Sequence, residues 1–330
     1  MSSQRTGPLV SVVTPFYNTA AYLAECIQSV LAQTFTDFEY LLVNNQSTDG
    51  SDRIAAEWAD RDPRIRLVHN PRFVGQVENY NGALEQIDSR SRYVKIVQAD
   101  DWIFPECLER MLAVAERHPT VGLVGAYYLE GNRVQGYGIP VEMEVLGGHD
   151  TNRGHLLGTC GVFGTPTTLM YRADLVRERH PPFTLDRVHE DSEFCFEVLR
   201  KSDFGFVHQV LSYLRVRPES ILAGASTYDW RELDAYITHR MFGAEFLGPS
   251  ERQMRMRRFE RLHLSRLGEA ALLWREPAYW AYHRRGLATI GERLRPFAIL
   301  PYVGKAALKA VLRPRWALAQ ARVSLQARRR

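Results

Sequence analysis

Apolar runs and segments of helical spacing alternate along the first part of the chain. Four apolar runs rich in β-branched residues predict strands at residues 9–13, 39–43, 66–69 and 93–97. Apolar positions three or four residues apart predict helices at residues 20–31, from about 51, at 77–87 and at 105–118. We therefore expect an α/β fold in which a mostly parallel central sheet is flanked by helices.

The alternation becomes irregular beyond residue 127. Nine glycines fall between residues 131 and 164, and their density predicts frequent turns and loops around a ligand site. Regular patterns return with a strand at 167–171, a helix at 192–199 and a turn followed by a closing strand over 203–211. The pattern predicts a globular domain over residues 1–222 and a helical C-terminal extension over residues 223–330.

Length and cysteine spacing narrow the class of protein. The 330 residues, 45% of them hydrophobic, are enough for one large domain with a buried core and an extension. The four cysteines lie far apart without a Cys-x-x-Cys pair, which argues against a zinc knuckle or a redox motif. Cys26 and Cys107 fall in apolar helical stripes, so we expect buried, reduced thiols and a cytoplasmic setting.

The apolar segments are too short for a leader or a membrane span. Residues 1–8 have no apolar core, and nowhere do eighteen apolar residues follow one another. We expect neither a secretory signal nor a spanning helix. The predicted location is the cytoplasm, either free or peripheral on the inner face of the cell membrane.

Positive charge is concentrated toward the C-terminal end. Residues 284–330 hold twelve Lys or Arg and one acid, Glu292, a local charge of +11 within a net charge of +4, which leaves −7 on residues 1–283. Apolar residues such as Phe297, Leu308 and Trp316 alternate with these cations, as in a helix that lies in a membrane interface. An anionic membrane surface is the favoured partner of this basic amphipathic tail; packing on the rest of the protein is the alternative, and nucleic acid is disfavoured.

Two adjacent acids follow the strand predicted at 93–97. They are Asp100 and Asp101, with Trp102 directly behind them. Open α/β sheets bind ligands at the carboxyl ends of their strands, and neighbouring carboxylates repel one another unless a cation such as Mg²⁺ or Mn²⁺ lies beside them. The pair indicates a site where a metal and a phosphate meet; taken alone, it also fits a solvated helix start.

Five short motifs follow one another along the chain. They are residues 10–18 (VSVVTPFYN), 29–34 (SVLAQT), 47–51 (STDGS), 99–101 (ADD) and 190–191 (ED). Their order and spacing resemble the inverting glycosyltransferases of family 2, of non-processive bacterial type, over roughly residues 9–220. The resemblance implies a GT-A fold in which residues 9–128 bind a nucleotide-sugar donor and residues 129–222 bind the acceptor.

The resemblance places several side chains at the donor. Thr14 and Pro15, where the first strand ends, and Tyr17, which can stack on a base or ribose, would face the nucleotide; the alternative is that they are only turn and core residues. Arg72 is a candidate contact to the donor phosphates, although a surface role is equally expected. Arg217 occupies the place of the family's usual phosphate-binding histidine; Arg215 is a further candidate, whereas His208 is more typical of a satisfied strand residue.

Three amides stand where the family usually has acids. Asn44 and Asn45 replace two aspartates, one of which contacts the base or ribose, so an amide remains to donate and accept but uracil is not implied. Gln98 replaces the first acid of the Asp-x-Asp metal motif and can bond to the ribose or to water on the diphosphate. The resemblance leaves Asp100, with Asp101 beside it, as ligands of a divalent Mg²⁺ or Mn²⁺ that would assist departure of the nucleoside diphosphate.

The last motif implies the catalytic base. Asp191 matches the family's general base, which takes the proton of the acceptor hydroxyl on the face of the sugar opposite the leaving diphosphate. A helix cap before the predicted helix is the alternative role. Glu190 and Trp102 are assigned to the acceptor side.

The sequence therefore favours an enzyme that transfers one sugar to a hydroxyl of a glycan or lipid-linked acceptor, in synthesis of surface polysaccharide, exopolysaccharide or cell-envelope glycan. The Gln-x-x-Arg-Trp motif of processive members does not follow Asp191. One alternative is a catalytically degenerate GT-A protein that binds a glycan or a partner, motivated by Asn45 and Gln98. A sugar-phosphate nucleotidyltransferase is disfavoured because residues 15–20 contain neither glycine nor a basic residue for a triphosphate.

Overall fold

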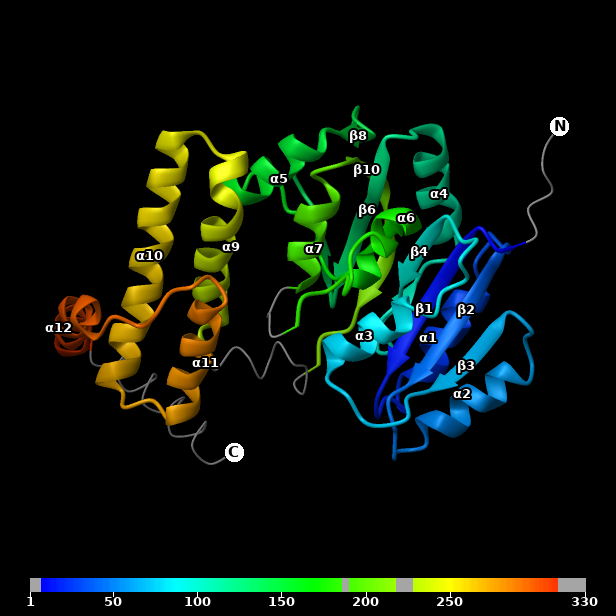
Figure 1. The fold of residues 1–330 in the computed structure, drawn as a ribbon, viewed down its shortest axis with the longest axis horizontal. Helices are drawn as coiled ribbons and strands as arrows, with labels where there is room; N and C mark the ends of the chain where they lie inside the picture. The colour runs from blue at the N-terminus through cyan, green and yellow to red at the C-terminus, as the bar shows by residue number, and fades with distance from the viewer. Residues whose placement is uncertain (1–6, 186–189, 218–227, 314–330) are drawn as a thin grey trace. The chain divides into compact units, whose positions relative to one another are not determined.

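The computed structural model describes residues 7–185, 190–217 and 228–313. The chain divides into two compact units. Described residues 7–185 and 190–216 build the first unit, and residues 217 and 228–313 belong to the second (Figure 1). The domain boundary predicted at residue 222 lies outside the described residues.

The first unit is built on a ten-stranded mixed sheet. Its main path follows the order β3-β2-β1-β4-β9-β6-β10-β5, with β7 paired to β6 and β8 paired to β10. The strands are β1 (Val10–Phe16), β2 (Phe38–Asn44), β3 (Ile65–His69), β4 (Tyr93–Ile96), β5 (Trp102–Ile103), β6 (Val121–Glu130), β7 (Arg133–Gln135), β8 (Val145–Leu146), β9 (Leu169–Arg172) and β10 (Asp203–Leu214).

Six of these strands share one direction. β3, β2, β1 and β4 pair in parallel, and β9 runs antiparallel between β4 and β6, so β6 and its parallel partner β10 point the same way as β4. The expected mostly parallel sheet is therefore confirmed. The carboxyl ends of β4, β6 and β10 and the start of β9 consequently meet at one edge of the sheet.

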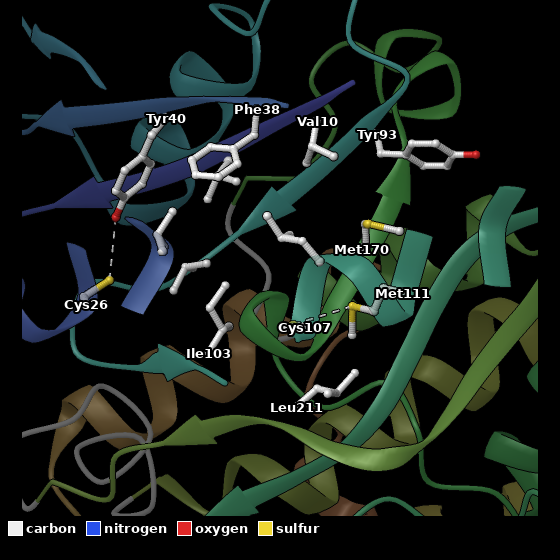
Figure 2. Close-up of a cluster of buried hydrophobic side chains, with 14 of the residues drawn as sticks. Val10, Cys26, Phe38, Tyr40, Tyr93, Ile103, Cys107, Met111, Met170 and Leu211 are labelled. Atoms are coloured by element: carbon white, nitrogen blue, oxygen red, sulfur yellow. Dashed lines mark hydrogen bonds between the residues drawn. The ribbon is translucent and has the colours of Figure 1, made fainter. Parts of the chain in front are cut away.

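Helices flank this sheet, as expected. They are α1 (Leu23–Leu31), α2 (Ser51–Ala59), α3 (Gln76–Leu84), α4 (Cys107–Arg117), α5 (Gly148–Leu157), α6 (Ala173–Arg177) and α7 (Glu190–Val198), with a 3₁₀ turn, η1 (Pro166–Thr168), before β9. One apolar cluster joins α1 and α4 to the same side of the strands, and Figure 2 shows Cys26 and Cys107 among its members. Both cysteines are buried free thiols, which confirms that expectation.

Three details of the predicted elements are wrong. The first strand does not close at Thr14 and Pro15 but continues to Phe16, so both residues are buried in β1. The glycine-rich stretch is not only loops, because it includes helix α5. The acids Glu190 and Asp191 do not precede the next helix; they form the first turn of α7.

Strand β6 is an element that the apolar pattern did not predict. Its run Val121–Glu130 contains Gly122 and Gly125, and glycine is unfavourable in strands. The structure supplies the reason for Gly125: an added Cβ would lie 2.8 Å from the ring of Phe204 on the neighbouring β10. The glycine lets a large aromatic side chain of one strand cross over the backbone of the next.

The described part of the second unit is helical, as expected for the extension. Its helices are α9 (Trp230–Phe246), α10 (Pro249–Leu272), α11 (Pro277–Ala288) and α12 (Pro296–Leu312). Two apolar clusters hold it together, one around Leu267 and Tyr279 and one around Leu233 and Leu287. Within the described ranges, no helix has the length and apolar character needed to cross a membrane. The predicted tail residues beyond Arg313, including Trp316, lie outside the described residues.

Two buried histidines couple α10 to α11. His263 Nε2 lies 3.0 Å from His283 Nδ1, and both side chains are buried. Burial lowers the pKa of His263 to about 4. Burial, and secondarily the charge of His263, lowers the pKa of His283 to about 3. Both imidazoles are therefore neutral in the folded protein at pH 7.

We predict that acid weakens the second unit through this pair. The unfolded chain protonates both imidazoles near their ordinary pKa of about 6.5, whereas the folded chain resists protonation, so stability falls as the pH drops from 6.5 toward 4. We expect a loss of at least about 2 kcal/mol by pH 4.5. Denaturant titrations followed by circular dichroism at a series of pH values measure it.

The double variant His263→Phe/His283→Phe should show a flatter pH dependence over the same range. His149→Gln is the matched control, because His149 is exposed on α5 of the first unit. An unchanged pH slope in the double variant would show that other groups cause the acid sensitivity.

Candidate active site

The two acids predicted to meet a metal lie in the loop that follows β4. Asp100 is half-buried and Asp101 is buried. The loop is a tight turn, closed by the N–H of Asp101 donating to the carbonyl of Gln98 at 2.9 Å. It leads into β5, where Trp102 and Ile103 pair antiparallel with Tyr213 and Ser212 of β10. The acids are thus fixed between two strands of the sheet.

The carboxylate of Asp101 is bonded within the fold. Its Oδ2 accepts a hydrogen bond from the hydroxyl of Thr167 at 2.7 Å, and its Oδ1 accepts one from the backbone N–H of Arg215 at 3.0 Å. Thr167 also accepts the backbone N–H of Gln98 at 3.0 Å. We call Asp101, Thr167 and the N–H groups of Gln98 and Arg215 the loop anchor. It ties the β4 loop to η1 and to the end of β10.

Tyr80 of α3 lies beside the same loop. The side-chain amide of Gln98 donates to the Tyr80 hydroxyl at 3.1 Å, and that of Gln76 donates to it at the same distance. Burial raises the pKa of Tyr80, and the negative charges of Glu190 and Asp100 raise it further. The charge of an acid on α7 and the charge of an acid in the β4 loop, 90 residues apart in the sequence, therefore both act on this one phenol.

The predicted base stands on α7 near β6. The N–H of Ser192 donates to Asp191 Oδ1 at 2.7 Å. Burial raises the pKa of Tyr128 on β6 to about 12, and the charges of Glu130 and Asp191 contribute to the shift. Glu190 and Asp191 occupy the first turn of the helix, where the helix dipole favours negative charge.

The two asparagines at the end of β2 are turned into the loops around them. The amide of Asn44 donates to Asp52 Oδ1 at 2.9 Å, and its Oδ1 accepts the N–H of Ser47. The Oδ1 of Asn45 accepts hydrogen bonds from Asn70 and from the N–H of Val74, and its amide donates to the carbonyl of Val74 at 2.9 Å. Both side chains are buried and brace the loops that follow β2 and β3.

The residues assigned to the nucleotide face differ in exposure. The hydroxyl of Thr14 donates to the carbonyl of Val97 at 2.8 Å and lies 3.0 Å from the hydroxyl of Tyr40. The side chains of Thr14 and Pro15 are buried in β1, and their predicted contact to the nucleotide stays a prediction. Tyr17 is 44% exposed and packs against the ring of Phe73, which is 58% exposed, with centroids 4.7 Å apart.

Trp102 and Arg215 form an aromatic and cationic stack at the start of β5. The indole lies on the ring of Tyr213 with a centroid separation of 3.7 Å. The guanidinium of Arg215 lies over Trp102 and over Tyr22, and its Nε donates to the carbonyl of Asp100 at 3.0 Å. Arg215 also forms an ion pair with Glu25. These contacts hold Arg215 against the acidic loop.

The positions of Arg72 and Arg217 do not test their predicted contacts to the donor phosphates. The side chain of Arg72, on the loop after β3, is 77% exposed and lies 3.3 Å from Glu78. Arg217 belongs to the second unit, so its predicted phosphate contact stays a prediction. His208 is a satisfied strand residue, as expected, with its ring nitrogens facing Tyr127 and the carbonyl of Met143.

Sequence reasoning missed Tyr80, Thr167 and Phe73. Tyr80 stands in a helix with an ordinary apolar pattern, and Thr167 in a short turn, so neither carried a local signal. Phe73 directly follows Arg72, and an exposed aromatic near a predicted base-stacking residue was the available clue.

The residues present are compatible with a metal held mainly by its substrate. Among the described residues, no three His, Cys, Asp or Glu side chains cluster closely enough to hold a metal ion. Mg²⁺ at a diphosphate is normally bound through one or two carboxylates together with phosphate oxygens. Asp100 supplies one such carboxylate at the carboxyl end of β4.

Comparison with solved structures supports the fold. S. aureus TarS 1-349 in complex with UDP-GlcNAc aligns with a TM-score of 0.62 at 20% identity, over 85% of this chain and 80% of that one. The mannosyltransferase PcManGT from Pyrobaculum calidifontis, in complex with GDP-Man and Mn²⁺, aligns with a TM-score of 0.53 at 18% identity, over 97% of this chain and 86% of that one. At these identities the likeness shows the shared GT-A fold.

Comparison of sequences adds the family. The glycosyltransferase GlyG of Streptococcus pneumoniae is 28% identical over 234 residues, 67% of this chain and 75% of that protein. The uncharacterized glycosyltransferase EpsJ of Bacillus subtilis is 33% identical over 144 residues, 42% of this chain and 39% of that protein. The family model described as "Glycosyl transferase family 2" matches residues 11–179, about half of the chain and most of the sheet. The chain therefore belongs to glycosyl transferase family 2 and is a transferase with the GT-A fold of its structural neighbours.

Proposed function

We propose that this enzyme moves a single sugar from a nucleotide-sugar donor to a hydroxyl of a glycan or lipid-linked acceptor, with inversion at the anomeric carbon. The observation that carries the proposal is the position of Asp100, which follows β4 at the edge of the sheet where β6 and β10 also end, in a chain that matches the family over residues 11–179. Solved neighbours that bind UDP-GlcNAc and GDP-Man support a donor of the same class. We place the reaction in the cytoplasm, in synthesis of exopolysaccharide or another surface or cell-envelope glycan.

On the donor side, we assign binding of the nucleotide sugar to the exposed rings of Tyr17 and Phe73 and to the carboxylate of Asp100. Tyr17 and Phe73 offer an aromatic surface for the base or ribose. Asn44, Asn45 and Gln98 keep the surrounding loops in place through their side-chain hydrogen bonds. The side chain of Arg72 is exposed, so it can reach the diphosphate of a bound donor. The sugar and the base are set by this surface and by the loops between β6 and β9.

We assign the metal contact to Asp100 and a positioning role to Asp101. A bound Mg²⁺ or Mn²⁺ would offset the charge of the departing nucleoside diphosphate. Asp101 already accepts the hydroxyl of Thr167 and the N–H of Arg215, which holds the loop so that Asp100 keeps one place at the end of β4. We propose this role for Asp101 in place of the second metal ligand that the sequence predicts, and the Asp101→Asn variant below tests that prediction.

On the acceptor side, Asp191 is the proposed general base. The acceptor oxygen forms a bond to the anomeric carbon while the bond from that carbon to the diphosphate oxygen breaks, and the hydroxyl proton passes to the Asp191 carboxylate. Attack from the face opposite the leaving group inverts the anomeric configuration. Glu190 and the Trp102 stack are the proposed contacts to acceptor hydroxyls and sugar faces.

A second candidate function is a glycan-binding or partner-binding protein without turnover. It is motivated by the loss of acid at Asn45 and Gln98, whose side chains are bonded inside the fold. The two functions differ in one measurable respect: only the transferase consumes a nucleotide sugar.

We predict separate losses from the two key acids. Asp191→Asn should lower transfer by about 10²–10⁴-fold and leave donor affinity unchanged, because it removes only the proton acceptor. Asp100→Asn should abolish the metal-dependent part of donor binding. Calorimetry with a panel of sugar nucleotides, with and without Mn²⁺ or Mg²⁺, and product analysis by NMR measure both. Asp60→Asn, an exposed acid at the end of α2, is the matched control.

Two results would contradict this assignment. A product that retains the anomeric configuration of the donor would remove the proposed role of Asp191. Absence of binding across the whole panel, in protein that is folded by circular dichroism, would favour the glycan-binding function.

We further predict that the loop anchor contributes to stability. Thr167→Val leaves the Asp101 carboxylate and the Gln98 N–H without their hydroxyl partner and should lower the free energy of unfolding by about 1–3 kcal/mol. Thr165→Val is a close control, because no hydrogen bond to the Thr165 hydroxyl is found within the described part of the chain. Denaturant unfolding compares the two variants.

Asp101→Asn separates positioning from metal binding. We expect it to destabilise the protein as Thr167→Val does while the metal-to-protein stoichiometry with donor stays unchanged. A fully stable Asp101→Asn variant that no longer binds metal with its donor would show that Asp101 is a ligand after all.

A further inference from the structure

Helix α12 presents an exposed apolar row along its length. Its positions, 297, 300–301, 304, 308 and 311–312, follow one another at helical spacing, which places them on one side of the helix. We call this row the outer face; it consists of Phe297, Leu300, Leu308, Val311 and Leu312, with the exposed Pro301 and Gly304 filling the middle of the row. Phe297 is 86% exposed and Val311 is 77% exposed, so these side chains contribute little to the core of the unit.

The opposite side of α12 already packs on the other helices. Ile299 and Ala306 are buried, and Ile299 belongs to the cluster around Leu267 and Tyr279. At Gly268 of α10, an added Cβ would lie 2.6 Å from the carbonyl carbon of Tyr302, so the two helices cross at close range. This inner face packs α12 on the helices of its own unit, whereas the side chains of the outer face are largely exposed.

A helix that is apolar on two sides needs a second apolar surface beside it. The charged residues on and beside α12 indicate which kind of apolar surface it binds. Helix α12 contains no acidic residue, it carries Lys305 and Lys309, and it is bordered by Arg295 and Arg313. Lys309 also bonds to Glu269 of α10 at 2.7 Å, which fixes the helix to its own unit. Cations beside an apolar row match the anionic headgroups and acyl chains of a bilayer surface.

The dimensions of α12 agree with a helix that lies in the plane of a membrane. Its 17 residues span about 26 Å at the usual rise per residue. It does not qualify as a spanning segment, since no described helix does. A short amphipathic helix with a basic border is bound at the boundary between headgroups and acyl chains.

We propose that the outer face of α12 docks the enzyme on an anionic lipid bilayer by inserting Phe297, Leu300 and Leu308 among the lipids. The proposal rests on the proposed function in one respect: membrane contact brings the enzyme to a lipid-linked acceptor and so selects that class over a soluble glycan. Docking through the outer face differs from attraction by charge alone, because the contribution of the inserted apolar side chains remains when salt screens the cations.

Vesicle flotation tests the docking surface in the full chain. Phosphatidylglycerol-containing vesicles are compared with phosphatidylcholine vesicles, at low and at high salt. The variant Phe297→Ser/Leu300→Ser/Leu308→Ser should partition about a hundredfold more weakly than the wild type, because three apolar side chains no longer leave water. The matched control, Val134→Ser/Val141→Ser/Met254→Ser, removes three side chains that are 60%, 76% and 68% exposed outside α12, and should bind as the wild type does.

A site-specific probe locates the contact. All four native cysteines are buried, so Leu300→Cys can be labelled selectively with an environment-sensitive fluorophore. On anionic vesicles the label should shift to shorter wavelength and be quenched by lipids that carry a quencher in the acyl chain. The same label at Met254→Cys on α10 should respond to neither.

Three outcomes would overturn the proposal. Wild-type protein that ignores anionic vesicles at low salt would do so directly. Equal binding by the outer-face variant, lost entirely at high salt, would assign docking to charge, including the cations beyond Arg313. A concentration-dependent dimer that the variant abolishes would identify a second copy of the chain as the occupant. A wild type that binds vesicles but consumes no sugar nucleotide would count against the proposed function and leave this inference intact.

Discussion

The carboxylate of Asp101 joins three segments that are far apart in the sequence, and the geometry of the candidate site depends on it. It accepts hydrogen bonds from the hydroxyl of Thr167 in η1, just before β9, and from the N–H of Arg215 after β10. The backbone N–H of the same residue closes the turn after β4. Topology makes this possible. Because β9 runs against β4 and β6, it begins at the edge where β4 and β10 end, so one buried carboxylate can reach all three.

Thr167 is held from two directions, which makes the anchor stiff. Its carbonyl accepts a hydrogen bond from Lys95 Nζ at 2.6 Å, and the carbonyl of Leu169 accepts a second at 3.1 Å. Lys95 is fully buried in β4, and desolvation lowers its pKa. The strand that presents the acids thus also secures the turn that braces them. A loop fixed in this way before the substrate arrives holds Asp100 in one place, which is the kind of preorganisation that transfer chemistry needs.

The sequence was sufficient to predict the fold class and the family. β-branched runs separated by helical spacing predicted β1 to β4 and their helices to within a few residues. The sequence could not predict β6, because the reason for Gly125 lies outside that strand. The glycine leaves room for the ring of Phe204 on the neighbouring β10. Nor could the sequence separate Asp100 from Asp101, since their difference comes from Thr167 and Arg215, residues brought near only by the order of the strands. The first strand was expected to end at Thr14 and Pro15, but β1 continues past both residues to Phe16.

The amides that replace the family's usual acids also have a physical explanation in this chain. Asn45 accepts from Asn70 and Val74 and donates to the carbonyl of Val74; a carboxylate could accept both bonds but could not donate the third. Asn44 donates to Asp52, and an acid at position 44 would instead repel it. Gln98 donates to Tyr80, whose pKa the charge of Asp100 already raises. Each amide therefore either donates and accepts hydrogen bonds at once or avoids placing a second negative charge beside an acid of the loop. Such matched use is expected of loops built around neutral side chains.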